Sequence, residues 1–186
     1  MDLCLMMGLW MLFNQDTFRS ASRYFCCDRS VVHYHYKIVI EALREMAPRY
    51  IKWPTRLERH NSVRHYERRF GMLGAFASID GSVFHITKPE IEPQRYVRDK
   101  MYGVKAQVVS DHRKLVRDLY VGQPASVHDS RVFRRSPLAQ NVFGRNDMMD
   151  PDQHILGDSA YSNTDKVRKY LQMRLSMPKA SSRHRQ

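Results

Sequence analysis

The sequence is poor in cysteine, in long apolar runs and in acidic residues. Its three cysteines are Cys4 and the adjacent Cys26 and Cys27, and no CxxC pair is present. An odd number with an adjacent pair does not make a disulfide framework, so the thiols indicate a reducing compartment. Cys26 and Cys27 are not spaced from His33 and His35 as zinc ligands commonly are, and we interpret them as buried thiols.

No apolar run is long enough for a membrane span. The most apolar stretch is MDLCLMMGLWMLF at residues 1–13, whereas a spanning helix needs about 20 apolar residues. This stretch contains Asp2 and has no Lys or Arg before its apolar part, which argues against a signal peptide. We therefore expect a core helix here and no membrane association.

Basic residues clearly outnumber acidic ones. The chain of 186 residues has 31 Lys and Arg against 19 Asp and Glu, so its formal net charge is +12. Such an excess favours a polyanionic partner, chiefly nucleic acid, because binding releases condensed counterions. A basic protein without such a partner is the alternative, since net charge says nothing about fold.

Residues 3–47 have apolar side chains at helical spacing. We expect a helix near the N-terminus, a short helix at 17–25 and a third helix that begins close to residue 28. Short helices joined by a tight turn can form a helix-turn-helix, with an ordinary helical bundle as the alternative. In the first case the third helix would face a DNA groove and present Arg29, His33, Tyr34 and Lys37.

The residues that follow are strongly basic. Pro48 and Pro54 are expected to end the helical part, and RLERHNSVRHYERRF at 56–70 predicts a surface helix that could contact DNA phosphates. Most such runs are only solvated faces. The composition predicts three parts: a helical, helix-turn-helix-like segment at 1–55, a basic connector at 56–72 and a sheet-containing domain at 73–186.

From residue 73 the sequence has the pattern of strands. LGAFASID and GSVFHIT flank Asp80-Gly81, which predicts a tight turn between two strands. The remaining expected strands are GVKAQVVSD, KLVRDLYVG and HILGD, and the expected helices are SVHDSRVF, capped by Ser126, and TDKVRKYLQMRL. This order predicts an α/β or α+β fold around one sheet.

Asp80 and Asp158 each end an expected strand. Side chains at the ends of neighbouring strands can converge, and two carboxylates brought together repel each other unless a cation lies between them. Mg²⁺ and Mn²⁺ prefer carboxylate oxygens, and a pair of such ions supports phosphodiester cleavage. A structural turn at each aspartate is the simpler alternative.

Four motifs occur in an order that is more specific than any one of them. They are SIDGSVFHI at 78–86, KAQVV at 105–109 with Asp111, QPASVHDSRVF at 123–133 and ILGDSAY at 155–161. With these motifs the chain resembles the Harbinger-type DDE transposases and the nucleases derived from them. The N-terminal FRSASRYFCCDRSVVHYHYKIVIEAL and YIKWP resemble the helical segment that precedes the catalytic domain in that family.

The resemblance implies an α/β, RNase H-like mixed sheet with flanking helices, preceded by the all-α segment. It also implies DNA cleavage that depends on a divalent metal cation, Mg²⁺ or Mn²⁺, and on two aspartates and a glutamate. By position, Asp80 and Asp158 correspond to the two aspartates and are the expected catalytic residues and metal ligands. Asp129, in the SVHDS motif, is a further candidate metal ligand or a helix-start hydrogen-bond acceptor.

The chain also departs from the family pattern. Val83 stands where the family usually has histidine, and Ala160 where it often has glycine. No glutamate follows Asp158, and the one later acid, Asp165, stands near the start of an expected helix, where capping explains it. We therefore expect a C-terminally truncated domain.

Two functions remain open on this basis. One is a transposase-derived nuclease whose turnover is reduced or absent without the third acid. The other is a catalytically inactive DNA-binding or partner-binding protein of transposon origin. The family and the charge imply DNA as the partner, in some cases together with a separate DNA-binding protein. They also imply nuclear localisation, with the cytoplasm as the alternative.

Overall fold

The chain forms two compact units, Met1–Ile51 and Lys52–Gln186. The computed structural model describes residues 2–14, 16–144 and 148–169. None of the helices in these ranges has the length and apolarity that crossing a bilayer requires. The units are described separately below.

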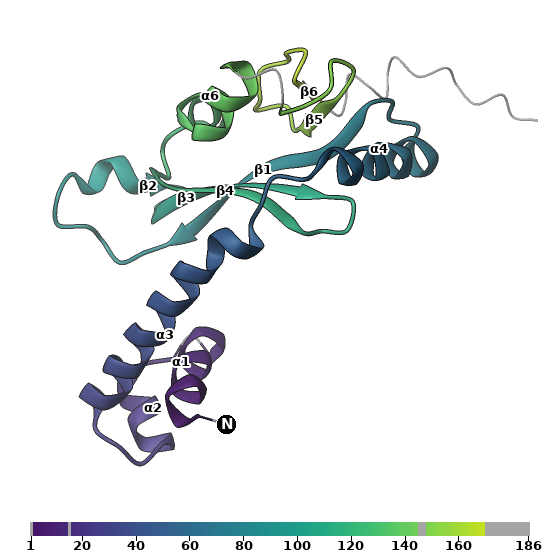
Figure 1. Cartoon of the computed structure of the whole chain (residues 1–186). Coiled ribbons are helices and arrows are strands. Elements are labelled where there is room, and N and C mark those ends of the chain that lie inside the picture. Colours follow the sequence, from purple (N-terminus) through teal and green to yellow (C-terminus); the bar gives the residue numbers. More distant parts are fainter. Residues whose placement is uncertain (1, 15, 145–147, 170–186) are drawn as a thin grey trace, which may run out of the picture. The chain divides into compact units, whose positions relative to one another are not determined.

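The first unit consists of three helices, as predicted (Figure 1). They are α1 (Leu3–Asn14), α2 (Phe18–Tyr24) and α3 (Arg29–Tyr50). The Thr17 hydroxyl accepts a hydrogen bond from the Ser20 N–H and so caps α2. Pro48 lies inside α3, so the prediction that it ends the helix was wrong. A proline this close to the helix end leaves few hydrogen bonds to disrupt.

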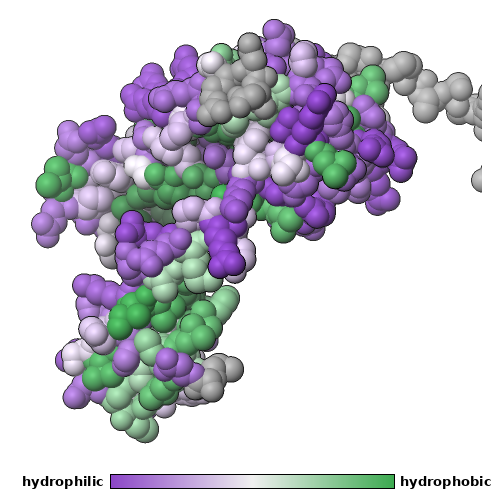
Figure 2. All heavy atoms as spheres, viewed as in Figure 1, coloured by the Kyte–Doolittle hydropathy of each residue, from purple (hydrophilic) through white to green (hydrophobic). Residues whose placement is uncertain are grey.

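The core of this unit is small. Met7, Ala21 and Val32 are fully buried, and aromatic side chains such as Trp10 and Phe18 pack around them. Many apolar side chains remain exposed, and Figure 2 shows hydrophobic residues over much of this unit's visible surface. A unit of three helices is too small to bury them all.

The second unit is built on a six-stranded mixed sheet in which β3, β1, β5 and β6 follow one another, and both β2 and β4 pair with β3. β1 pairs antiparallel with β3, and β3 with β4, whereas β5 and β6 are parallel to β1. Three antiparallel strands followed by two parallel ones give an RNase H-like fold, which confirms the predicted fold class. The strands are β1 (Ala75–His85), β2 (Val97–Arg98), β3 (Met101–Asp111), β4 (Val116–Pro124), β5 (His154–Gly157) and β6 (Val167–Lys169).

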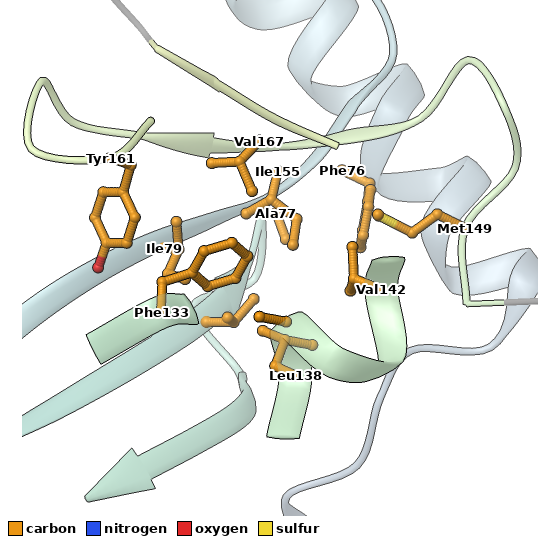
Figure 3. Packing of buried hydrophobic residues seen from close by; sticks show 12 residues of the cluster. Phe76, Ala77, Ile79, Phe133, Leu138, Val142, Met149, Ile155, Tyr161 and Val167 are labelled. Atoms are coloured by element: carbon orange, nitrogen blue, oxygen red, sulfur yellow. The ribbon is translucent and has the colours of Figure 1, made fainter. Parts of the chain in front are cut away.

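Helices cover both faces of this sheet. On one side α4 (Arg56–Phe70) packs through Tyr66 against Met72, Ala75 and Leu156. On the other side lie α5 (Asp129–Arg135) and α6 (Pro137–Gly144), and Figure 3 shows their contacts with β1 and β5. The buried apolar residues on this second side form the larger core cluster of the unit: Phe76, Ala77, Ile79, Val109, Phe133, Leu138, Ala139, Val142, Met149, Ile155, Tyr161 and Val167.

Three local predictions were wrong. β1 continues through Asp80-Gly81 without a turn, because both residues pair with β3 opposite Val108 and Gln107. Residues Val167–Lys169 form strand β6 rather than a helix, since Val167 is buried beside Ile155 of β5; residues 170–175 of that expected helix lie outside the described residues. His128, not Ser126, is the N-cap of α5, and the Ser126 hydroxyl instead donates to the Arg95 carbonyl.

Candidate active site

The pairing of β1 with β5 brings Asp80 and Asp158 to neighbouring positions. The last pair of this parallel ladder is Ile79 of β1 with Gly157 of β5. Asp80 directly follows Ile79, and Asp158 directly follows Gly157. Because paired strands lie about 4.8 Å apart, the aspartates leave adjacent points of the main chain. Asp80 is thus within a strand, at the point where its neighbour strand has ended, and not in a turn.

An open hollow of about 360 Å³ lies at this point. All three aspartates singled out in the sequence, Asp80, Asp129 and Asp158, line it. Its other lining residues are Gly81, Val83, His85, Arg98 and Asp99. The fold therefore gathers these three carboxylates around one solvent-accessible space.

Main-chain amides hold one oxygen of each carboxylate, Asp80 and Asp158. Oδ1 of Asp80 accepts a hydrogen bond from the Gly81 N–H at 2.8 Å. Oδ1 of Asp158 accepts one from the Ala160 N–H at 2.9 Å, which closes a tight turn after β5. Neither carboxylate has an ion pair with another described residue. Asp158 is therefore a turn residue and, at the same time, a carboxylate with an oxygen left for a ligand.

Asp129 is held differently. It is the first residue of α5, and its Oδ1 accepts a hydrogen bond from Lys105 Nζ at 2.7 Å. The Lys105 side chain is 1% exposed and that of Asp129 17%, so this is a buried ion pair. A Cβ atom at position 81 would overlap Asp129 Oδ1, so the absence of a side chain at Gly81 is what allows this carboxylate to approach β1.

Two buried polar groups lie in this region without a hydrogen-bond partner among the described residues. The Tyr161 hydroxyl is one; its ring packs on Gly157 and against Phe133, and Figure 3 shows the oxygen pointing away from the aliphatic cluster. The amide of Gln107, opposite Gly81 in β3, is the other. Unpaired buried polar groups are costly, and they are found at functional sites more readily than elsewhere.

The charges of the three carboxylates reach Tyr161. Burial raises the pKa of its hydroxyl well above the ordinary value, and the negative charges of Asp129, Asp80 and Asp158 raise it further. Tyr161 therefore stays a neutral hydrogen-bond donor beside the hollow at physiological pH. The sequence had shown Lys105, Gln107 and Tyr161 only as parts of motifs. The signal for the first two was the presence of polar residues at alternate positions in an apolar strand.

The donor set fits a hard divalent cation in part. Asp80 and Asp158 offer two carboxylates, whereas Oδ1 of Asp129 is already bonded to Lys105. Within the described ranges, no three or more His, Cys, Asp or Glu side chains form a group that could hold a metal ion. Asp165 is exposed in the bend before β6, so it is not at the start of a helix.

A comparison with protein-family models decides the family. Residues 79–186, more than half of the chain, match the model described as DDE superfamily endonuclease. The chain belongs to this family. The matched range begins one residue before Asp80 and includes Asp129 and Asp158. No curated protein and no solved structure matches the chain.

The N-terminal residues of this DDE superfamily endonuclease that were expected to contact DNA lie on α3. Arg29, His33 and Lys37 are exposed and four residues apart, so they share one face of the helix. The His33 ring packs edge-on against Phe18 of α2, with 5.1 Å between ring centroids. Arg29 and Lys37 are accordingly the more accessible of the three, and Tyr34 is exposed on a neighbouring face.

Proposed function

We propose that this DDE superfamily endonuclease is of the Harbinger type and hydrolyses phosphodiester bonds of DNA with Mg²⁺ or Mn²⁺. The observation that supports this proposal is the position of Asp80 and Asp158. They directly follow the last paired residues of two adjacent parallel strands and line the same hollow. A turn residue would need only its main-chain position, whereas both carboxylates here also face a common space.

The residues of the chain have distinct parts in this proposal. Asp80 and Asp158 would hold the cation, which when bound makes water more acidic and stabilises the leaving oxygen. The β1–β5 ladder sets the spacing of the two carboxylates, and the amides of Gly81 and Ala160 orient them. Lys105 holds Asp129 through Oδ1, and the second oxygen of this lining residue, Oδ2, is a further candidate ligand.

The test is nicking of supercoiled plasmid by the full chain in Mg²⁺ or Mn²⁺. We expect Asp80→Asn and Asp158→Asn to reduce nicking to the background rate, because each removes an anionic ligand and keeps the side-chain volume. Asp99→Asn is the matched control, since Asp99 lines the same hollow but its side chain is 92% exposed. Equal nicking by all three variants would rule out the assigned roles of Asp80 and Asp158.

A second function is favoured by one specific observation. Within the described residues, no group of three or more His, Cys, Asp or Glu side chains could hold a metal ion. A protein that binds DNA or a partner protein through its positive charge without cutting would fit this. It predicts that the wild-type chain does not nick in either metal but binds duplex DNA with a steep salt dependence.

We propose the nucleus as the location, on the net charge and the family. We also propose that α3 contacts the DNA through Arg29 and Lys37, with His33 beside them. Replacing Arg29 and Lys37 together by alanine should then weaken duplex binding, and unchanged affinity would exclude this role for α3. Imaging of the tagged chain in cells tests the location.

A further inference from the structure

A second hollow is lined by residues of α4 and by His112, which follows β3, and its lining is basic. It measures about 380 Å³, and its lining residues are Asn61, Arg64, His65, Arg68, Arg69 and His112. We call these six residues the α4 patch. No acidic side chain is among them, and the visible surface over α4 is mostly hydrophilic (Figure 2).

The arginines of α4 fall into two groups. Arg56, in the first turn, lies 3.4 Å from Asp150, and Arg59 is buried against Gln153. Arg64, Arg68 and Arg69 have no carboxylate partner among the described residues. The first group is used within the fold, so only the second group is available for an outside ligand.

Two acids near the patch are already paired, and Glu67 of α4 accepts a hydrogen bond from the Gly74 N–H. Glu58 and Asp111 bond to Arg117, and both also approach Arg113. Burial lowers the pKa of His112, and the charges of His65, Arg113 and Arg117 lower it further, against an opposing effect of Asp111. The arginines of the patch have no carboxylate partner, so their charges make the local potential positive, and an anion is the natural ligand of such a place.

The helix dipole explains only part of this arrangement. Basic residues in the last turn of a helix are stabilising there, which accounts for Arg68 and Arg69. It does not account for Arg64 and His65, one turn earlier, or for His112, which comes from the end of β3. The His65 and His112 rings lie 4.8 Å apart and join the two elements into one surface.

The spacing of the patch fits a nucleic-acid backbone. The three arginines of the patch, Arg64, Arg68 and Arg69, span five helical steps on one face of α4, or about 7.5 Å. A DNA strand rises about 3.4 Å per phosphate, so this length corresponds to roughly two phosphates. Three unpaired guanidinium groups over that length are enough to neutralise such a segment.

We propose that the α4 patch binds the phosphate backbone of duplex DNA, with Arg64, Arg68 and Arg69 as the contacts. The patch shares no residue with the aspartate hollow or with α3. The proposal relies on the proposed function only in taking DNA as the ligand. Contacts of this kind position a duplex but read no sequence, so they would hold the DNA in place at any target.

The test compares two double variants of the full chain that remove the same charge. Arg64→Gln with Arg68→Gln changes the patch, and glutamine keeps a high helix propensity. Arg131→Gln with Arg134→Gln is the control, since both of these arginines are exposed on α5 and have no ion pair within the described ranges. Circular dichroism checks that both variants keep the fold.

Binding is measured by fluorescence anisotropy with a labelled 20-base-pair duplex at several salt concentrations, without divalent metal. Losing two phosphate contacts should reduce the magnitude of the slope of log K against log salt by about 1.8. If the two proteins bind equally at 1 M salt, the patch variant should then bind roughly 60-fold more weakly than the wild type at 0.1 M salt. The control should keep the wild-type slope. An unchanged slope in the patch variant, or an equal fall in the control, overturns the proposal.

The readout also separates this proposal from the proposed function. Binding without metal does not depend on Asp80 or Asp158 acting in catalysis. A chain that shows the patch-dependent slope but never nicks plasmid supports the α4 patch and contradicts the nuclease. If the wild-type chain nicks plasmid and the patch variant keeps the wild-type slope, the nuclease is supported and the α4 patch is contradicted.

Discussion

The buried ion pair between Lys105 and Asp129 links β3 to the start of α5 and allows a quantitative test of the site. Lys105→Met removes the ammonium group and keeps most of the apolar stem. Removing one partner of a buried pair generally costs about 3–5 kcal/mol, because the other charge is left uncompensated. Asp129 retains 17% exposure, so water can partly solvate it and we expect the lower end, about 3 kcal/mol.

The reverse change should cost more. Asp129→Asn leaves the Lys105 ammonium, which is 1% exposed, with only a neutral acceptor. The double variant Lys105→Met with Asp129→Asn contains neither charge, so its loss of stability should be smaller than the sum of the two single losses by about 2 kcal/mol. This difference is the coupling of the two side chains.

Urea unfolding followed by tryptophan fluorescence measures these free energies. The chain has two tryptophans, Trp10 in the first unit and Trp53 in the second. In a Trp10→Phe background only Trp53 reports, and it packs against Phe76 and donates a hydrogen bond to the Met148 carbonyl. If the two single losses add to within about 0.5 kcal/mol, the ion pair does not exist in solution.

Three further predictions use the same unfolding assay. Gly81→Ala should cost about 1–3 kcal/mol, because the new methyl overlaps the Asp129 carboxylate, and the cost should shrink in an Asp129→Gly background. Burial lowers the pKa of His154 to about 4, so the unfolded chain binds more protons between pH 6.5 and 4; stability should fall by about 3 kcal/mol over that window, and His154→Gln should flatten the fall. A hydrogen bond from the Thr55 N–H, and a second one from Arg117, lower the pKa of Glu58 to about 2. The contribution of ionised Glu58 to the free energy of unfolding should therefore be complete above pH 4.5 and decline toward pH 2, and Glu58→Gln should remove this pH dependence.

Local pattern was sufficient for most of the fold. The runs GVKAQVVSD, KLVRDLYVG and HILGD became β3, β4 and β5, and the basic run at 56–70 became α4. The Asp80-Gly81 turn failed because a turn propensity worth a fraction of a kcal/mol competes with the full ladder to β3. Val167–Lys169 failed for a similar reason, since pairing with β5 buries Val167.

The site was predictable only where strand ends define it. Asp80 and Asp158 were paired on the expectation that both end a strand; Asp158 does follow β5, whereas Asp80 lies within β1, beside the point where β5 ends. The ion pair of Lys105 and the buried hydroxyl of Tyr161 depend on where α5 and the loop after β5 pack, which no local pattern encodes.

The charge of the whole chain and the charge of the hollow have opposite signs, which yields a last prediction. The net charge of +12 attracts DNA, whereas Asp80, Asp129 and Asp158 repel a phosphate at short range. Without divalent metal, Asp80→Asn should therefore strengthen duplex binding, by a few-fold at 0.1 M salt, even though it abolishes nicking in the proposed mechanism.

Anisotropy titrations of the wild-type chain and Asp80→Asn in the presence of a chelator measure this difference. Asp2→Asn makes the same charge change at an exposed position of the first unit and serves as the control. Tighter binding by Asp80→Asn alone means that the DNA backbone reaches the hollow. Equal binding by the two variants means that DNA held by this chain does not approach the aspartates, and the assignment of Asp80 to cleavage would then fail on geometric grounds.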